Sequence, residues 1–153
     1  MNHTQLRILI ADDDDGHAML IQEHLEDAGI QNPIRRFRDG QEIWDFLTVK
    51  AGSDYDPKHE YMLLLDIRMP KLDGVEVLRR IKGDPSLHAI PVIMLTTTDD
   101  PREVAECYAL GCNSYVTKPI NFEDFTEVIH RLGLFVEVMA VAPPRVSVKK
   151  APP

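Results

Sequence analysis

The stretch Tyr61–Gly74, which reads YMLLLDIRMPKLDG, constrains the fold more than any other part of the chain. Its apolar residues run directly into Asp66, and turn signals follow at Met69-Pro70 and at Asp73-Gly74. An unbroken apolar run bounded by turn signals predicts a strand that is buried on both faces. In an open parallel sheet, reactive groups collect at the carboxyl ends of the strands. Asp66 is therefore expected at the edge of such a sheet.

Runs of strand length alternate with helical patterns along the rest of the chain. Strands are predicted at Leu6–Ala11, Pro33–Phe37, Tyr61–Leu65, Pro91–Thr96 and Ser114–Thr117. Helices are predicted between Gly16 and Gly29, around Ile43–Leu47, over Gly74–Lys82, over Pro101–Leu110 and from Asn121 to Leu132. This alternation implies βαβ units and a parallel sheet with helices on both faces. The arginines of the second strand favour a place at the sheet edge, and Lys50–Glu60 reads as a long polar loop.

Length and charge narrow the class of protein. A chain of 153 residues suits one domain, and its net charge of −8 argues against nucleic acid as a partner. No apolar run approaches the roughly 20 residues of a membrane helix, and the N-terminus lacks a signal-peptide layout. Cys107 and Cys112 do not have metal-site or CxxC spacing, so reduced packing residues in a cytoplasmic protein are expected.

Polar side chains follow several of the predicted strands. Asp12 and Asp13 come after the first strand, Asp66 after the third, Thr96 at the end of the fourth and Lys118 after the fifth. Converging carboxylates repel unless a hard cation joins them, and Mg²⁺ accepts a few carboxylates while keeping several waters. A lysine and a threonine hydroxyl suit phosphate oxygens. The pattern predicts a nucleophilic Asp66 that forms an acyl phosphate.

Each of these residues also has a plainer explanation. The run Asp12–Asp15 is compatible with a solvated helix start, because acidic side chains favour that position. Asp66 is compatible with a strand-end turn, Thr96 with a β-former and Lys118 with surface charge. His17 suits a solvated position in the first turn of a helix. The joint placement at the strand ends of one parallel sheet favours a functional site.

The motifs together resemble the bacterial response-regulator receiver domain. They are DD at Asp12-Asp13, D-x-x-M-P-x-x-D-G over Asp66–Gly74, the strand-end Thr96 and K-P at Lys118-Pro119. The resemblance covers residues 5–133 and implies a flavodoxin-like fold with strand order 2-1-3-4-5. It further implies that a sensor histidine kinase phosphorylates Asp66, and that the chain catalyses only its own phosphorylation and slow autodephosphorylation.

By the same resemblance, a Mg²⁺ or Mn²⁺ ion would be held by four residues. Asp13, Asp66 and the main-chain carbonyl of Arg68 would bind it directly, and Asp12 would act through water. Asp14 and Asp15 exceed the family's usual acidic pair and are expected only to intensify the local attraction for a cation.

Further residues are implied to read or modulate the phosphoryl group. Thr96 and Lys118 would contact it, and Tyr115 lies at the family's aromatic switch position, with a half-buried strand tyrosine of fixed rotamer as the alternative. Thr97 is expected to crowd the approach of water and prolong the life of the acyl phosphate. The side chain of Arg68 is a second candidate for screening the site.

The segment 134–153 extends beyond the expected receiver domain and is too short for an output domain. Its first half is apolar, and an exposed apolar segment invites association. This arm, together with the long polar loop and the threonine run, resembles single-domain regulators that pair with bacterial phytochromes. The resemblance predicts a homodimer through the last strand, the last helix and the arm, with an arm packed on its own domain as the alternative. Residues 145–153 are expected to be disordered.

Two other functions compete with a signalling switch. A haloacid-dehalogenase-type phosphatase also uses an aspartyl nucleophile with Mg²⁺, but its nucleophile follows the first strand and has a second acid two residues on. Here Asp66 follows the third predicted strand, and Arg68 occupies the position of that second acid. A receiver-like scaffold that carries no phosphoryl group is disfavoured by the intact set of site residues.

Overall fold

The computed structural model describes residues 6–27, 29–49, 53–97, 100–117 and 127. Within them the order of elements is β1 (Leu6–Ala11), α1 (Asp15–Asp27), β2 (Ile34–Phe37), α2 (Gly40–Leu47), β3 (Glu60–Leu65), α3 (Gly74–Lys82), β4 (Val92–Thr96), α4 (Pro101–Leu110) and β5 (Ser114–Thr117). The predicted helix from Asn121 to Leu132 and the arm 134–153 lie outside the described residues, apart from residue 127.

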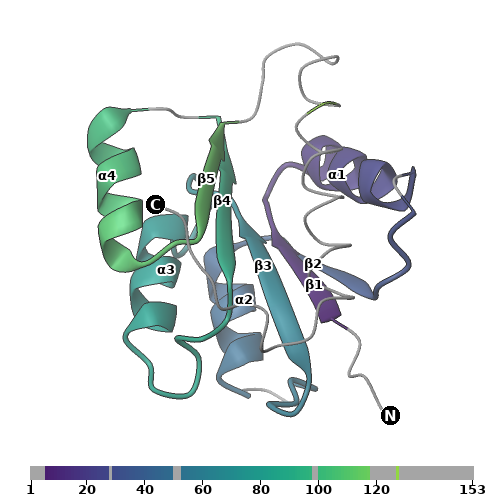
Figure 1. Ribbon diagram of the computed structural model, residues 1–153, viewed down its shortest axis with the longest axis horizontal. Coiled ribbons are helices and arrows are strands. Elements are labelled where there is room, and N and C mark those ends of the chain that lie inside the picture. The colour runs from purple at the N-terminus through teal and green to yellow at the C-terminus, as the bar shows by residue number, and fades with distance from the viewer. Residues whose placement is uncertain (1–5, 28, 50–52, 98–99, 118–126, 128–153) are drawn as a thin grey trace, which may run out of the picture.

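The strands form one parallel sheet in the order β2-β1-β3-β4-β5. This confirms the predicted flavodoxin-like arrangement and places β2 at an edge, as its arginines indicated. Figure 1 shows α2, α3 and α4 along one face of the sheet and α1 on the other. The carboxyl ends of the strands point to the top of that view.

The central strand β3 is buried on both faces, as its unbroken apolar sequence predicts. Successive side chains of a strand point to opposite faces of the sheet. Leu63 and Leu65 accordingly join the core cluster that includes residues of α2 and α3, while Met62 and Leu64 join the cluster that includes residues of α1. Every one of these four side chains is at most 1% exposed. Asp66 therefore follows a rigid, fully packed strand.

The observed boundaries differ slightly from the predicted ones, and the differences have local causes. Pro33 and Pro91 stand just before β2 and β4; a proline cannot donate a ladder hydrogen bond, but their carbonyls accept from Ile8 and Leu63 at 2.9 Å. The loop before β3 contributes a side chain to the core, although most of its residues are polar. Tyr55 stacks on Tyr61, with ring centroids 5.0 Å apart, and packs partly buried against the core.

Two glycines allow helices to approach the loop after β3. A Cβ at Gly74 would lie 2.0 Å from the carbonyl oxygen of Asp66, and a Cβ at Gly40 would lie 1.7 Å from that of Leu72. Contacts under 3.0 Å are essentially never seen for a real Cβ. The N-termini of α2 and α3 thus rest directly on the backbone of the loop that begins at Asp66.

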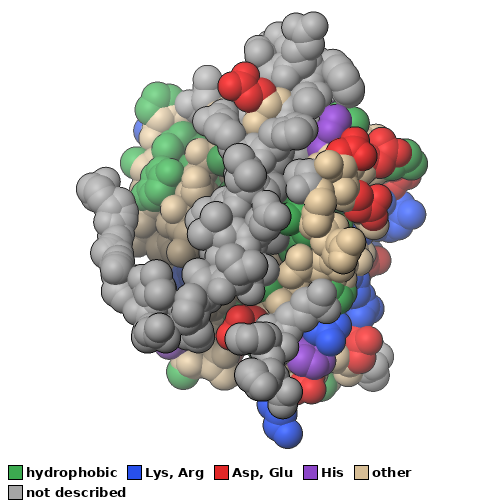
Figure 2. Space-filling view, turned by 45° about the vertical axis from the view of Figure 1, so that its right-hand side comes forward, with side chains coloured by type: hydrophobic (Ala, Val, Ile, Leu, Met, Phe, Trp, Pro, Cys, Tyr) green, Lys and Arg blue, Asp and Glu red, His purple; other side chains and the backbone are tan. Residues whose placement is uncertain are grey.

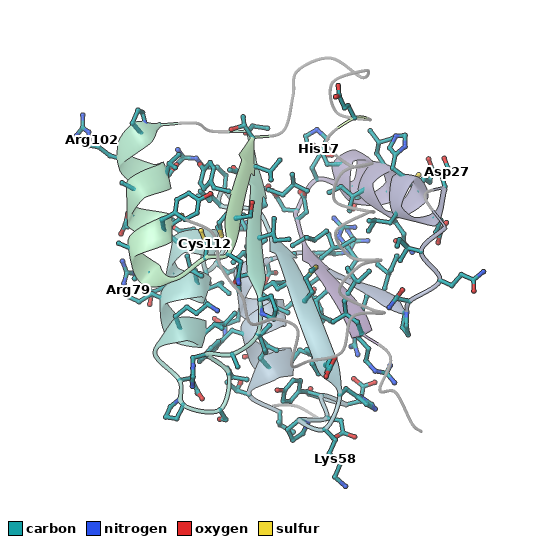
Figure 3. The ribbon with its side chains drawn as sticks, in the orientation of Figure 1. His17, Asp27, Lys58, Arg79, Arg102 and Cys112 are labelled. Atoms are coloured by element: carbon teal, nitrogen blue, oxygen red, sulfur yellow. The ribbon has the colours of Figure 1, made fainter. Side chains whose placement is uncertain are left out.

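The cysteines and the lengths of the helices test two further expectations from the sequence. Cys107 and Cys112 are free and buried, as predicted, and burial raises the pKa of their thiols to about 12 and about 11. Figure 3 shows Cys112 between the sheet and α4. Among the described residues, no helix is long and apolar enough to cross a membrane.

Candidate functional site

The site lies at the carboxyl ends of the three central strands. Asp12 follows β1, Asp66 follows β3 and Thr96 ends β4, and these strands are neighbours in the sheet. The backbone ladder continues into the site, since the Asp66 N–H donates to the Ala11 carbonyl at 2.9 Å. His17 lies near this upper edge and Lys58 at the opposite edge, which shows how far the site stands from the base of the sheet (Figure 3).

Three carboxylates meet at this edge. One oxygen from each of Asp12, Asp13 and Asp66 lies within 4.8 Å of the other two. Asp12 and Asp66 are 2% and 7% exposed, whereas Asp13 is exposed to solvent. Hard oxygen ligands with one open side suit Mg²⁺ or Mn²⁺, which retain several waters. The donor set therefore fits the predicted cation, which would also offset the repulsion among the three charges.

The Asp66 carboxylate is held in place by the start of its own loop. Its Oδ1 accepts a hydrogen bond from the Ile67 N–H at 2.8 Å. The Ile67 carbonyl in turn accepts from the N–H groups of Met69 at 3.1 Å and Gly74 at 2.8 Å. The loop is thus closed back on itself, and α3 begins where it closes. A buried strand, a closed loop and a helix start together fix this carboxylate at the edge of the sheet.

The remaining two aspartates of the run have structural partners. Asp14 precedes α1; its Oδ1 accepts from the His17 N–H at 3.0 Å and its carbonyl accepts from the Ala18 N–H at 3.0 Å, which is the geometry of a helix N-cap. The Asp14 N–H donates to Asp12 Oδ1 at 2.9 Å. Figure 2 shows acidic side chains gathered on the α1 side of the molecule, with basic side chains below them.

Asp15 pairs with two arginines of the neighbouring strand and its end. Its Oδ1 accepts from Arg36 Nη1 at 2.7 Å and from Arg38 Nη1 at 2.9 Å. The Arg36 hydrogen bond, followed by the charges of Arg38 and Arg36, lowers the pKa of Asp15 below its usual value. The cap role of Asp14 agrees with the helix start that was the plainer explanation of the acidic run, whereas the pairing of Asp15 with arginines was not predicted, since Asp15 was expected only to intensify the attraction for a cation. The basic residues at the end of β2 were the available signal.

The predicted switch residues occupy different environments. Thr96 is fully buried, with 0% exposure, while Thr97 beside it is exposed. Tyr115 lies on β5, opposite Met94 of β4, and packs partly buried against the core cluster on the α2–α4 face. Its N–H donates to the hydroxyl of Tyr108 on α4 at 3.0 Å. Lys118 lies outside the described residues.

Arg68 reaches from the loop toward α4. Its Nη2 lies 3.6 Å from Oε1 of Glu103, which is in the first turn of that helix. The Arg68 side chain is 67% exposed and that of Glu103 only 18%. The carbonyl of Arg68 as a cation ligand and its side chain as a screen of the phosphoryl group both stay predictions.

Comparison with known proteins identifies relatives over most of the chain. A family model described as the response regulator receiver domain matches residues 8–130. A solved receiver domain from Rhodospirillum rubrum has 40% identity and a TM-score of 0.82, covering 87% of this chain and 94% of that one.

Two further relatives are response regulators: one is named for a phytochrome, and the other has a solved structure with a bound metal ion. The solved structure of the phosphorylated cyanobacterial phytochrome response regulator RcpA shows 30% identity and a TM-score of 0.81, with 90% of this chain and 97% of that chain covered. Response regulator Rcp1 from Synechocystis sp. is 34% identical over 128 residues, or 84% of this chain and 86% of that protein. The Mn²⁺-bound form of Rcp1 aligns with a TM-score of 0.78 at 29% identity, covering 97% of this chain and 99% of that one.

Proposed function

The chain belongs to the response regulator receiver family, and we propose that it is a single-domain regulator whose Asp66 accepts a phosphoryl group from a sensor histidine kinase. The reaction depends on Mg²⁺ or Mn²⁺ bound beside Asp66. The phosphorylated protein then signals by a change at the face formed by β4, β5 and the last helix. The observation that carries this proposal is the meeting of Asp12, Asp13 and Asp66 at one sheet edge.

The chemistry assigned to Asp66 is a phosphoryl transfer between two side chains. An oxygen of its carboxylate attacks the phosphorus of a phosphohistidine, the P–N bond breaks as the P–O bond forms, and the imidazole takes up a proton. The chain's part is to orient the nucleophile, and the Ile67 N–H at Oδ1 does so. Asp13, Asp66 and the Arg68 carbonyl would hold the cation, with Asp12 acting through water, and the bound ion would supply neutralisation of the charge on the transferred group.

The phosphoryl group would be read from inside the protein. Thr96 is buried at the end of β4, so its hydroxyl meets the acyl phosphate from the sheet side. Movement of Thr96 makes room for Tyr115, which packs two residues back along the same strand pair. Lys118 adds a point charge for the phosphoryl oxygens. Because Arg68 stands where an aspartyl phosphatase needs its second acid, the phosphatase alternative has no support in this site.

The proposed kinase is of the bacteriophytochrome type, since relatives of this chain include phytochrome response regulators. We place the reaction in the cytoplasm, in keeping with the reduced cysteines. The homodimer through β5, the last helix and the arm is part of this proposal. Apart from residue 127, the last helix and the arm lie outside the described residues. A monomeric mass of the full chain by light scattering, at tens of micromolar, would contradict the dimer.

The central test is to incubate the protein with acetyl phosphate and Mg²⁺ and to measure its intact mass. One added phosphoryl group is expected on the wild type and none on Asp66→Asn. Chelation of the divalent ion should prevent the gain. A wild type that gains no mass, or an Asp66→Asn variant that gains as much as wild type, would contradict the proposed function. Transfer from a phosphorylated phytochrome kinase then tests the partner.

A further inference from the structure

Arg36 holds the acidic loop from the neighbouring edge strand. Its Nε and Nη2 both donate to the carbonyl oxygen of Asp12, at 3.0 Å and 2.7 Å, while its Nη1 donates to the Asp15 carboxylate at 2.7 Å. The side chain is 18% exposed, so it lies largely beneath the loop. A guanidinium is a rigid fork of donors, and here that fork joins Asp12, the first residue after β1, to Asp15, the first residue of α1.

Asp12 is consequently fixed at each polar group of its backbone and at one oxygen of its side chain. Its N–H donates to the Phe37 carbonyl at 3.1 Å, its carbonyl accepts from Arg36, and its Oδ1 accepts from the Asp14 N–H at 2.9 Å. The Asp12 carbonyl belongs to the planar peptide that leads into Asp13. The bonds from Arg36 therefore also set the direction in which the chain presents Asp13, the exposed member of the carboxylate cluster.

The positive charge of an arginine beside a cation site would by itself weaken binding of the cation. The carboxylate of Asp15 offsets this charge, because it accepts a hydrogen bond from Arg36 Nη1 at 2.7 Å and so places a negative charge beside the guanidinium. Arg38 contributes a second, more exposed partner at 2.9 Å. Arg36 can thus brace the loop with its charge locally balanced, and Asp15 acts as counter-ion to the arginines.

We propose that Arg36 is a positioning residue for the divalent cation: through its bonds to the Asp12 carbonyl and the Asp15 carboxylate it orients Asp12 and Asp13 so that they bind the ion together with Asp66. This inference rests on the proposed function, since it assumes a cation at the three carboxylates. Groups that orient metal ligands contribute to metal affinity even though they do not touch the metal. Asp15 and Arg36 together thereby explain why the acidic run is longer than the pair that binds the ion.

Removal of Arg36 should change the affinity for the cation in a direction that depends on how Arg36 acts. If Arg36 acted only through its charge, its removal would tighten binding of a cation, because a repulsive neighbour is lost. If it acts by orienting the loop, its removal weakens binding despite the lost repulsion. Arg38 provides the matched control, because it bonds to the same Asp15 oxygen but has no bond to Asp12 among those that the structure records.

The experiment measures Mn²⁺ binding to the full chain through the electron paramagnetic resonance signal of the free ion. Arg36→Met is expected to raise the dissociation constant by about tenfold or more, the range seen for residues that orient metal ligands. Arg36→Lys keeps the charge but loses the fork, so it should also bind more weakly than wild type. Arg38→Met should stay within about twofold of wild type or bind slightly more tightly, as expected for an exposed ion pair.

A urea unfolding curve for each variant separates this role from simple loss of stability. A destabilised variant that is still folded in native buffer would bind Mn²⁺ normally if Arg36 were only structural. Should Arg36→Met fail to fold, Arg36→Lys decides in the same assay. Wild-type affinity in the folded Arg36 variants, or tighter binding, overturns the inference and leaves the proposed function standing. Absence of Mn²⁺ binding by the wild type overturns the proposed cation site itself.

Discussion

Gly74→Ala is the substitution whose effect on Asp66 follows most directly from the structure. The added Cβ would lie 2.0 Å from the Asp66 carbonyl oxygen, 2.8 Å from its carbonyl carbon and 2.8 Å from the Ile67 Cα. Since contacts under 3.0 Å do not persist, α3 and the Asp66 backbone must separate by about 1 Å. The Gly74 N–H, which donates to the Ile67 carbonyl at 2.8 Å, opposes that separation.

Two consequences of different size are expected. Overpacking of this kind destabilises a protein by roughly 1–3 kcal/mol. Helix propensity favours alanine by up to about 1 kcal/mol and offsets part of this, so a net loss of about 1–2 kcal/mol is expected in urea unfolding. A shift of about 1 Å in a reacting group lowers a rate by about 10²-fold, so the initial rate of mass gain from acetyl phosphate should fall far more than the stability suggests.

Two other glycines serve as controls. Gly40→Ala meets an even closer carbonyl oxygen, that of Leu72 at 1.7 Å, but does not press on Asp66; it should lose at least comparable stability while phosphorylation stays within a few-fold of wild type. Gly83, at the other end of α3, has its nearest atom at 3.2 Å and a φ of −89°, so Gly83→Ala should change stability by less than about 0.5 kcal/mol. Equal slowing by Gly40→Ala and Gly74→Ala, or a normal rate in Gly74→Ala, would refute the reasoning.

Two shorter predictions concern the rim of the site. Thr97→Ala should lose its phosphoryl group faster than wild type, because the exposed β-branched side chain next to Thr96 no longer crowds water; an unchanged decay of the phosphorylated mass would contradict this. Asp15 has a pKa lowered by Arg36, so its contribution to stability is present above its unfolded value of 3.8 and is lost as pH falls through the folded value. Urea midpoints of Asp15→Asn should therefore fall less steeply than those of wild type on acidification below pH about 4, and parallel curves would show that the pairing adds nothing.

The fold was predictable because its strongest signals are local and repeat along the chain. The predicted bounds of β1, α3, α4 and β5 are those observed, since each has an apolar pattern that ends at a clear signal: the aspartate run after β1, a glycine after each of the two helices and Lys118-Pro119 after β5. The start of α1 was less accessible, because any of four successive aspartates can serve as a cap. The packing of the partly buried Tyr55 against Phe46 and Tyr61 was hidden by the polar residues around it in the loop.

The grouping of Asp12, Asp13 and Asp66 was predictable for a different reason. Parallel strands end at the same edge, so residues that follow neighbouring strands must meet there whatever the details of packing. The contact of Arg68 with Glu103 was not predictable in the same way, because it depends on where the first turn of α4 settles relative to the loop after β3. Side-chain pairs between a loop and a helix have no periodic signal in the sequence.

The separate roles of the residues in Asp12–Asp15 were only partly predictable from the sequence. The residues are chemically identical, so nothing within the run separates a cation ligand from a cap or a counter-ion. The neighbouring strand does separate them: Ala11 pairs with Phe37, which brings the arginines on either side of Phe37 to the beginning of the acidic loop. Strand order 2-1-3-4-5 places the basic end of β2 beside the acidic end of β1. Some of the carboxylates are therefore expected to pair with arginines. Strand adjacency, combined with charge, thus carries information about the site that the motif alone does not.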